Sequence, residues 1–190
     1  MAISSTFVTG QVFTAADANL MANSGLVYIT GGSLSTATTD FVGCFSSTYD
    51  NYRVVINAPA VSSAADIYFR LLIGTTPTIA NYHYVVLGAN TAGTTLNTFG
   101  VAGGEIYTGW TTTSGAAGLN VGLVVQDITS PFLAKRTGFT GSLFSYQTAF
   151  KHGTAGGIHD ADTSHTGLRI STLTAATLTG SVAIYGYRKA

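Results

Sequence analysis

The chain has 190 residues, of which only 8% are charged, and its 8 Lys and Arg residues balance its 8 Asp and Glu residues to a net charge of zero. Nucleic-acid binding relies on a surplus of basic side chains that neutralise phosphates, so this balance argues against nucleic acid as a partner. The 46% of hydrophobic residues is enough to form a packed core, which argues against intrinsic disorder.

The mean hydropathy is positive, at +0.34, but the apolar residues do not form a membrane-spanning run. A spanning helix needs about 20 consecutive apolar residues, and the richest stretches, 67–73 and 119–125, are short and interrupted. The first six residues lack the charged and apolar regions of a signal peptide. Cys44 is the single cysteine, so no internal disulfide can form. We therefore expect a protein of the cytosol with no membrane insertion, consisting of one compact domain and a short appendage.

Residues 1–25 form the predicted appendage. Thr14 is a suitable N-cap, Asp17 stands three residues later, and Gly25 is a suitable stop for a short helix. A helix of about ten residues is marginal in water by itself, so it must dock on its own domain or on a neighbouring molecule. In the second case, residues 1–25 are an assembly anchor. The candidate anchor residues are Phe7, Val12, Phe13, Thr14, Asp17 and Leu20.

From residue 26 onward, the hydrophobic pattern changes to a period of two, as in 67, 69, 71 and 73 or 119, 121, 123 and 125. Such alternation is typical of half-buried strands. The predicted strands are near 26–30, 40–45, 52–58, 66–73, 82–88, 105–110, 119–127, 138–147, 166–173 and 181–188. No second helical pattern interrupts them. We therefore expect residues 26–190 to form an all-β domain, an antiparallel β-sandwich of the jelly-roll kind.

The sequence offers little evidence of catalysis. It contains no nucleophile elbow, zinc-protease motif or phosphate-binding glycine loop, and its one Glu, Glu105, has no evident partner carboxylate. Cys44 lies in an apolar segment, which indicates a small core residue and not a nucleophile. We expect no enzymatic activity and no cofactor.

Three of the four histidines fall within residues 151–165, together with two aspartates. His159, Asp160, Asp162 and His165 are ligand types that hold a divalent metal, but their spacing matches no known metal motif. The segment is interpreted as a polar surface loop, and no metal is expected.

Aromatic residues are the other candidate feature. Tyr82, Tyr84, Tyr107 and Trp110 provide flat faces on which a sugar ring can stack. The same residues suit a core or a subunit interface equally well, because aromatic side chains dominate both. Alternation places Tyr82 and Tyr84 on one face of their strand.

The segment 7–20, FVTGQVFTAADANL, resembles a segment near the start of tail-fibre and other small virion proteins of tailed bacteriophages. The stretches 45–52 and 180–187 look like parts of a β-rich domain found in similar proteins. The resemblance implies a structural role in the virion, often as a homotrimer. The chain lacks the repeats, heptads and shaft of long fibres.

These observations favour a virion subunit of the tail-fibre or baseplate kind, assembled in the host cytoplasm. Its N-terminal segment would dock on other virion proteins, and its sandwich would contact host-surface glycan. A capsid decoration protein is the alternative within this class. A glycan-active enzyme or a free lectin is the alternative from another class.

Overall fold

The computed structural model describes residues 25–63, 65–108, 121–146, 150–172 and 174–189, and these are built from antiparallel strands with no helix. The predicted N-terminal helix and the anchor residues in 1–24 lie outside the described residues. The strands are β1 (Leu26–Thr36), β2 (Thr38–Phe41), β3 (Asn51–Val61), β4 (Ile67–Ile73), β5 (Thr76–Pro77), β6 (Tyr82–Asn90), β7 (Thr95–Gly103), β8 (Ile106–Tyr107), β9 (Val121–Thr129), β10 (Thr137–Tyr146), β11 (Phe150–His159), β12 (Gly167–Thr172) and β13 (Leu178–Tyr187). The predicted all-β antiparallel sandwich is confirmed.

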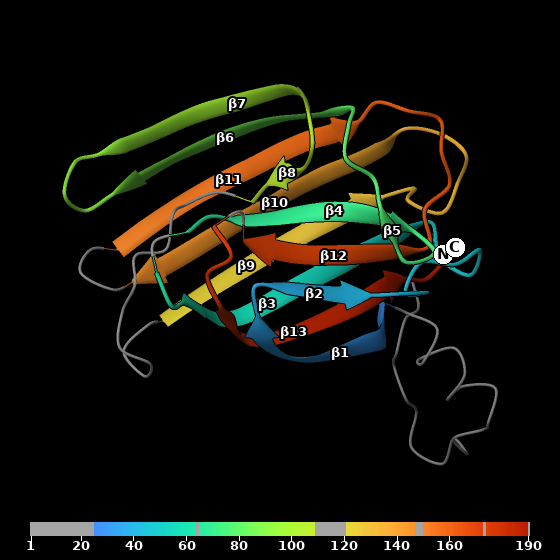
Figure 1. Ribbon diagram of the computed structural model, residues 1–190, viewed down its shortest axis with the longest axis horizontal. Helices are drawn as coiled ribbons and strands as arrows, with labels where there is room; N and C mark the ends of the chain where they lie inside the picture. Colours follow the sequence, from blue (N-terminus) through green and yellow to red (C-terminus); the bar gives the residue numbers. More distant parts are fainter. Residues whose placement is uncertain (1–24, 64, 109–120, 147–149, 173, 190) are drawn as a thin grey trace, which may run out of the picture.

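The strands form two sheets that face each other (Figure 1). The large sheet has eight strands in the order β1-β13-β3-β9-β10-β11-β6-β7, and the small sheet has the order β2-β12-β4-β5, with β8 also paired to β4. A jelly roll alternates its eight strands, B to I, between sheets ordered B-I-D-G and C-H-E-F. The order β1-β13-β3-β9 corresponds to the first sheet, and the order β2-β12-β4-β5/β8 corresponds to the second.

The sixth strand of this jelly roll is divided. Strand β5 pairs with Leu72 and Ile73 at one end of β4, and β8 pairs with Tyr68 and Phe69 at the other. Between β5 and β8 the chain leaves the small sheet, forms the β6–β7 hairpin in the large sheet and returns. Strands β10 and β11 are a second insertion between β9 and β12, and they join the hairpin to the rest of the large sheet.

Side chains and backbone groups close the gap left in the divided strand. The backbone N–H of Leu71 donates a hydrogen bond of 2.8 Å to the Tyr82 hydroxyl, and the carbonyl of Leu71 accepts one from Thr78 N–H at 2.9 Å. The Arg70 guanidinium donates to the Gly104 carbonyl at 3.1 Å and pairs with Glu105. The two ends of the insertion are thereby held at the edge of β4.

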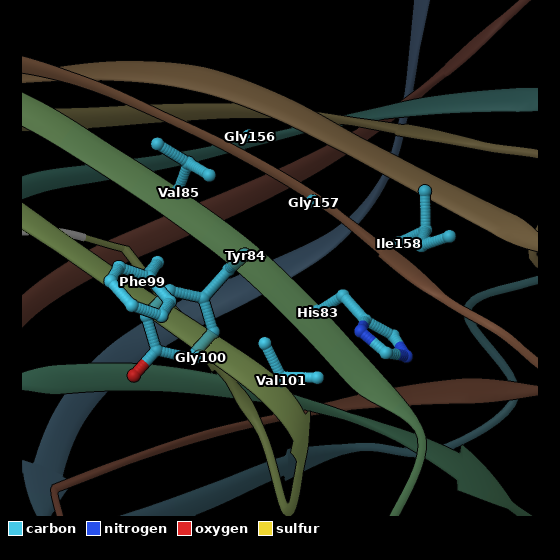
Figure 2. A pocket seen from close by; sticks show the side chains of 9 residues that line it. All are labelled: His83, Tyr84, Val85, Phe99, Gly100, Val101, Gly156, Gly157 and Ile158. Atoms are coloured by element: carbon cyan, nitrogen blue, oxygen red, sulfur yellow. The ribbon is translucent and has the colours of Figure 1, made fainter.

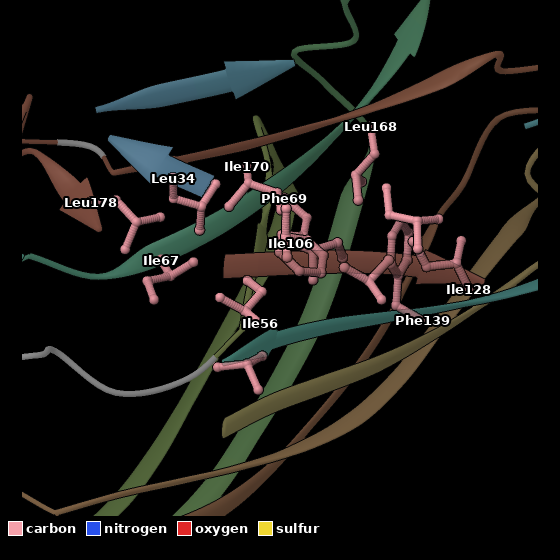
Figure 3. Packing of buried hydrophobic residues seen from close by; sticks show 14 of the residues in the cluster. Leu34, Ile56, Ile67, Phe69, Ile106, Ile128, Phe139, Leu168, Ile170 and Leu178 are labelled. Carbon is pink, nitrogen blue, oxygen red and sulfur yellow. The ribbon is translucent and has the colours of Figure 1, made fainter. Parts of the chain in front are cut away.

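The core lies between the sheets. Ile56 and Ile128 of the large sheet meet Phe69, Leu168 and Ile170 of the small sheet, and all five side chains are fully buried (Figure 3). A separate cluster of Tyr68, Val86, Tyr107 and Ala155 packs where β8 approaches β6 and β11.

Two sequence interpretations need correction. The segment 151–165 was interpreted as a polar surface loop, whereas 150–159 is strand β11, paired with β10 on one side and β6 on the other. Its glycines and small residues hide the alternation, but Gly153, Ala155 and His159 are buried while their neighbours are not. Strand β7, rich in Thr and Gly, was not predicted at all.

Two adjacent glycines of β11 should respond differently to substitution. A Cβ atom at Gly157 would lie 2.2 Å from the His83 carbonyl oxygen, so Gly157→Ala forces neighbouring backbones apart and should lower the free energy of unfolding by about 1–3 kcal/mol. A Cβ atom at Gly156 would meet nothing closer than 3.6 Å, so Gly156→Ala should be neutral or stabilising by up to about 1 kcal/mol. Urea unfolding of both variants measures the difference, and equal stabilities would contradict the packing described for β11.

Candidate functional site

One row of paired residues crosses the whole outer face of the large sheet. From β1 to β7 its members are Tyr28, Tyr185, Arg53, Asp127, Thr140, Gly156, Val85 and Phe99. Neighbouring strands lie about 4.8 Å apart, so the row is about 34 Å long. Its first four members are two tyrosines and an ion pair. Its last four members carry no charge, and the last two, Val85 and Phe99, are apolar. The outer face therefore has two halves of different chemistry.

The first half, which we call the tyrosine half, lies on β1, β13, β3 and β9. Arg53 donates two hydrogen bonds of 2.8 Å to the Asp127 carboxylate, one to each oxygen. The Tyr187 hydroxyl donates to the same carboxylate at 2.7 Å, and the Arg53 guanidinium lies 5.5 Å from the centre of the Tyr187 ring. The hydrogen bonds from Arg53 lower the pKa of Asp127, with Tyr187 contributing, so this carboxylate is ionised at neutral pH.

The second half, which we call the apolar half, lies on β10, β11, β6 and β7, and its exposed apolar side chains stand mainly on the last three strands. Val85, Leu87, Phe99, Val101 and Ile158 expose 51, 52, 71, 69 and 39% of their surface. Four of them, Val85, Phe99, Val101 and Ile158, line a shallow groove of about 440 Å³ together with His83, Tyr84, Gly100, Gly156 and Gly157 (Figure 2). No residue from Leu71 to Gly104 is Asp, Glu, Lys or Arg, so the hairpin carries no formal charge except that of any protonated histidine. Exposed apolar surface of this kind is typical of an interaction site.

Strand β7 is the last strand of the large sheet on this side. Natural proteins protect such edges with Lys, Pro, charges or very short strands, because unpaired backbone groups attract other strands. Strand β7 has nine residues and contains neither Pro nor a charged residue. The edge beside the apolar half therefore carries none of these sequence devices, and the register shift of β7 opposite Tyr82 and Tyr84 is its one structural irregularity among the described residues.

Of the aromatic residues predicted to contact glycan, Tyr82 and Tyr107 lie apart from both halves, whereas Tyr84 is among the residues that line the groove. Tyr82 is fully buried, with its ring 4.8 Å from His159, and Tyr107 is 6% exposed in the small cluster with Tyr68. Tyr84 is half-buried and its ring lies against Gly100, on the inner face of the sheet. Tyr82 and Tyr84 share one face of β6, as alternation predicted, and that face is the inner one. Trp110 lies outside the described residues.

The hydroxyls of Tyr68 and Tyr107 both bond the Asp66 carboxylate, at 3.2 and 3.1 Å, and their rings stack with centres 5.2 Å apart. Burial, followed by the charge of Asp66, raises the pKa of Tyr68. These contacts give Tyr68 and Tyr107 a packing role between β4, β8 and β6.

The four metal-candidate residues do not converge. His159 and His165 point inward and are fully buried, with ring centres 4.8 Å apart, whereas Asp160 pairs with Arg136 and Asp162 is exposed. Within the described residues, no three side chains of His, Cys, Asp or Glu type gather in a way that would hold a metal ion.

Five of the carboxylates are held in ion pairs. Asp40, Asp50, Asp127, Asp160 and Glu105 each pair with Arg or Lys. Cys44 is buried, and burial raises the pKa of its thiol to about 12, so it is a poor nucleophile. Among the described residues, no helix is long and apolar enough to cross a membrane.

The chain matches no protein-family model, no curated protein and no solved structure. The two halves of the outer face are the features that sequence reasoning missed. Tyr185 and Tyr187 lie two residues apart in a predicted strand, which signals a shared face, but their alignment with Tyr28 and Arg53 depends on the strand order.

The buried histidine pair should make the protein sensitive to acid. Burial lowers the pKa of both imidazoles, that of His165 to about 4 with His159 contributing, and no ring nitrogen of either makes a hydrogen bond of normal geometry within the described residues. Below pH 6.5 the unfolded chain binds protons that the folded chain does not. As the pH falls, the free energy of unfolding should therefore decrease by about 1.4 kcal/mol per pH unit for each proton that the unfolded chain binds and the folded chain does not.

Urea unfolding between pH 7 and 4 measures this slope in the wild type and in His165→Leu. In the variant, the pH dependence of the free energy of unfolding should be smaller by the contribution of about one proton, whatever the stability of the variant at pH 7. The control is His152→Leu on the exposed face of β11, which should keep the slope of the wild type. An unchanged slope in His165→Leu would show that this imidazole is not held neutral by the fold.

Proposed function

We propose that this chain is a structural subunit of a tailed-bacteriophage particle, most simply at a tail fibre or baseplate. Residues 1–25 dock it on other virion proteins, and the sandwich assembles with copies of itself as a homotrimer. The resemblance of segment 7–20 to small virion proteins supports the source, and the jelly-roll fold, which occurs in viral capsid proteins as well as lectins, is compatible with it.

The observation that carries the assembly role is the apolar half of the outer face. Phe99 and Val101 of the edge strand β7 are about 70% exposed, and removing such side chains from water yields about 25 cal/mol per Å². A partner that covers this surface must itself be apolar and uncharged there. A charged group on the partner would lose its hydration and find no opposite charge on the hairpin to compensate.

A second copy of the chain meets this requirement. The β6–β7 hairpin of each copy is uncharged, so apolar halves gathered around the three-fold axis of a homotrimer meet without repulsion between like charges. Most soluble oligomers are symmetric assemblies of identical chains, which also favours this occupant.

Catalysis finds less support in the described residues. Five of the carboxylates are paired with cations, the thiol is buried, and the outer face holds no pair of free acid and base groups. A capsid decoration protein would use the same apolar half and the same anchor. Adsorption of the purified protein to whole host cells separates the two locations, since only a tail-fibre or baseplate subunit requires it.

Charging the apolar half should dissociate the assembly. The double variant Phe99→Asp and Val101→Asp places like charges in the contact between copies, which should weaken self-association at least about 100-fold. Sedimentation velocity of the full chain over a range of concentrations measures this. Val42→Asp, which charges an apolar residue 53% exposed just after β2, is the control and should sediment like the wild type. A wild type that stays monomeric at 100 μM, or a double variant that still assembles, would contradict the proposal.

Removing residues 1–24 should abolish incorporation into particles while leaving a folded domain. The described core extends from Leu34 to Ile184 and includes strands from both sheets, so the sandwich has its own hydrophobic centre. Circular dichroism tests whether the shortened chain folds, and complementation of a deletion phage tests incorporation. A shortened chain that unfolds, or one that still enters particles, would refute the anchor role.

A further inference from the structure

We propose that the tyrosine half of the outer face is a binding site for an uncharged saccharide, centred on Tyr28. The proposal rests on the proposed function only for the source of the sugar, which would be the surface of a host cell. The site differs from the aromatic residues that the sequence singled out, and none of its residues lies in the apolar half.

The first observation is the position of the Tyr28 ring. Its side chain is 59% exposed, and its hydroxyl lies 3.2 Å from where a Cβ atom of Gly31 would be, so the ring lies along β1 above a residue without a side chain. The Tyr185 ring meets it edge to face, with centres 5.8 Å apart, and fixes its orientation. Tyrosine held in this way offers a rigid contact area at low cost in conformational entropy.

The second observation is the polar group beside these rings. Arg53 and Asp127 continue the row from Tyr28 and Tyr185, and their two hydrogen bonds lock them into a neutral pair. Both side chains are about a third exposed, at 35 and 30%, so part of each faces water. The guanidinium N–H groups that Arg53 does not use on Asp127 are therefore available to a ligand, whereas the Asp127 carboxylate, which already accepts from Arg53 and Tyr187, has less acceptor capacity left.

The chemistry of the site selects the ligand. Because the charge of Arg53 is balanced by Asp127, the site has no net attraction for a phosphate, a nucleic acid or a charged peptide. A sugar ring combines a C–H face that packs on an aromatic ring with hydroxyls that both donate and accept hydrogen bonds. Such a ring covers Tyr28 with its C–H face while its hydroxyls reach towards Arg53 and Asp127.

Small residues underlie the aromatic rings. Gly31, over which the Tyr28 ring lies, and Ala183 occupy the neighbouring outward row on β1 and β13. Among the described residues the site is thus a flat strip, which suits an internal segment of a polysaccharide. Several copies in one particle would bind such a polymer with avidity.

The test uses the full chain on a printed array of purified bacterial O-antigen and capsular polysaccharides, with glucose, galactose and N-acetylglucosamine hexamers as defined probes. Affinity for each bound glycan is then measured by titration calorimetry. The wild type should bind at least one uncharged glycan, Tyr28→Ala should bind it about tenfold more weakly, and Tyr28→Phe should bind it within about threefold. The matched control is Tyr146→Ala, which removes a tyrosine 51% exposed on β10 of the same sheet and should leave affinity unchanged.

The proposal is overturned if the wild type binds no glycan, if it binds only acidic ones, or if Tyr28→Ala and Tyr146→Ala behave alike. These outcomes are distinct from failure of the proposed function. The variant Phe99→Asp with Val101→Asp should retain the affinity of each site for glycan hexamers, because its changes lie on β7 at the far end of the row. If the wild type binds sugar but does not self-assemble, the proposed assembly role is contradicted and the proposed saccharide site still stands.

Discussion

The divided strand at the outer edge of β4 is the constraint on which the rest of the molecule depends. A continuous strand there would keep residues 78–105 in the small sheet. Instead, the Leu71 N–H donates to the Tyr82 hydroxyl, and the Arg70 guanidinium bonds the Gly104 carbonyl and Glu105. Polar groups at the edge of β4 therefore have hydrogen-bond partners even though the hairpin leaves the small sheet. Buried backbone groups must find hydrogen-bond partners. The Tyr82 hydroxyl and the Arg70–Glu105 pair take the place of the missing strand at this edge, so the hairpin is free to join the opposite sheet.

The consequence is a jelly roll with one oversized sheet. Four added strands, β10, β11, β6 and β7, extend the large sheet beyond the small one. Half of the outer face thereby belongs to the basic fold and half to the insertions, and the two halves differ in composition. The tyrosine half carries the partly exposed Arg53–Asp127 ion pair, whereas the apolar half ends at β7, the edge strand of the large sheet. The proposed roles follow this division, with assembly through the inserted strands and ligand contact through the original ones.

Alternating hydrophobic residues allowed the fold class and most of the strands to be predicted from sequence. Strands β7 and β11 were missed because Gly, Thr and Ala have no strong hydrophobic contrast, although β11 lies inside the large sheet and β7 forms its edge. The aromatic residues of β6 were recognised as sharing a face, but alternation alone cannot say which face is the inner one. The row from Tyr28 to Phe99 could not be predicted, since it requires the order of eight strands that are distant in sequence.

If the hairpin β6–β7 carries the contact between copies, its amide hydrogen exchange must depend on protein concentration. Exchange of the β7 amides, Thr95–Gly103, is followed by mass spectrometry in the full chain at low and at high protein concentration. The β7 amides should exchange markedly more slowly at high concentration, while those of β2, at the edge of the small sheet, should not change. Equal exchange of β7 at all concentrations, in a protein that sediments as an oligomer, would place the contact between copies elsewhere on the molecule.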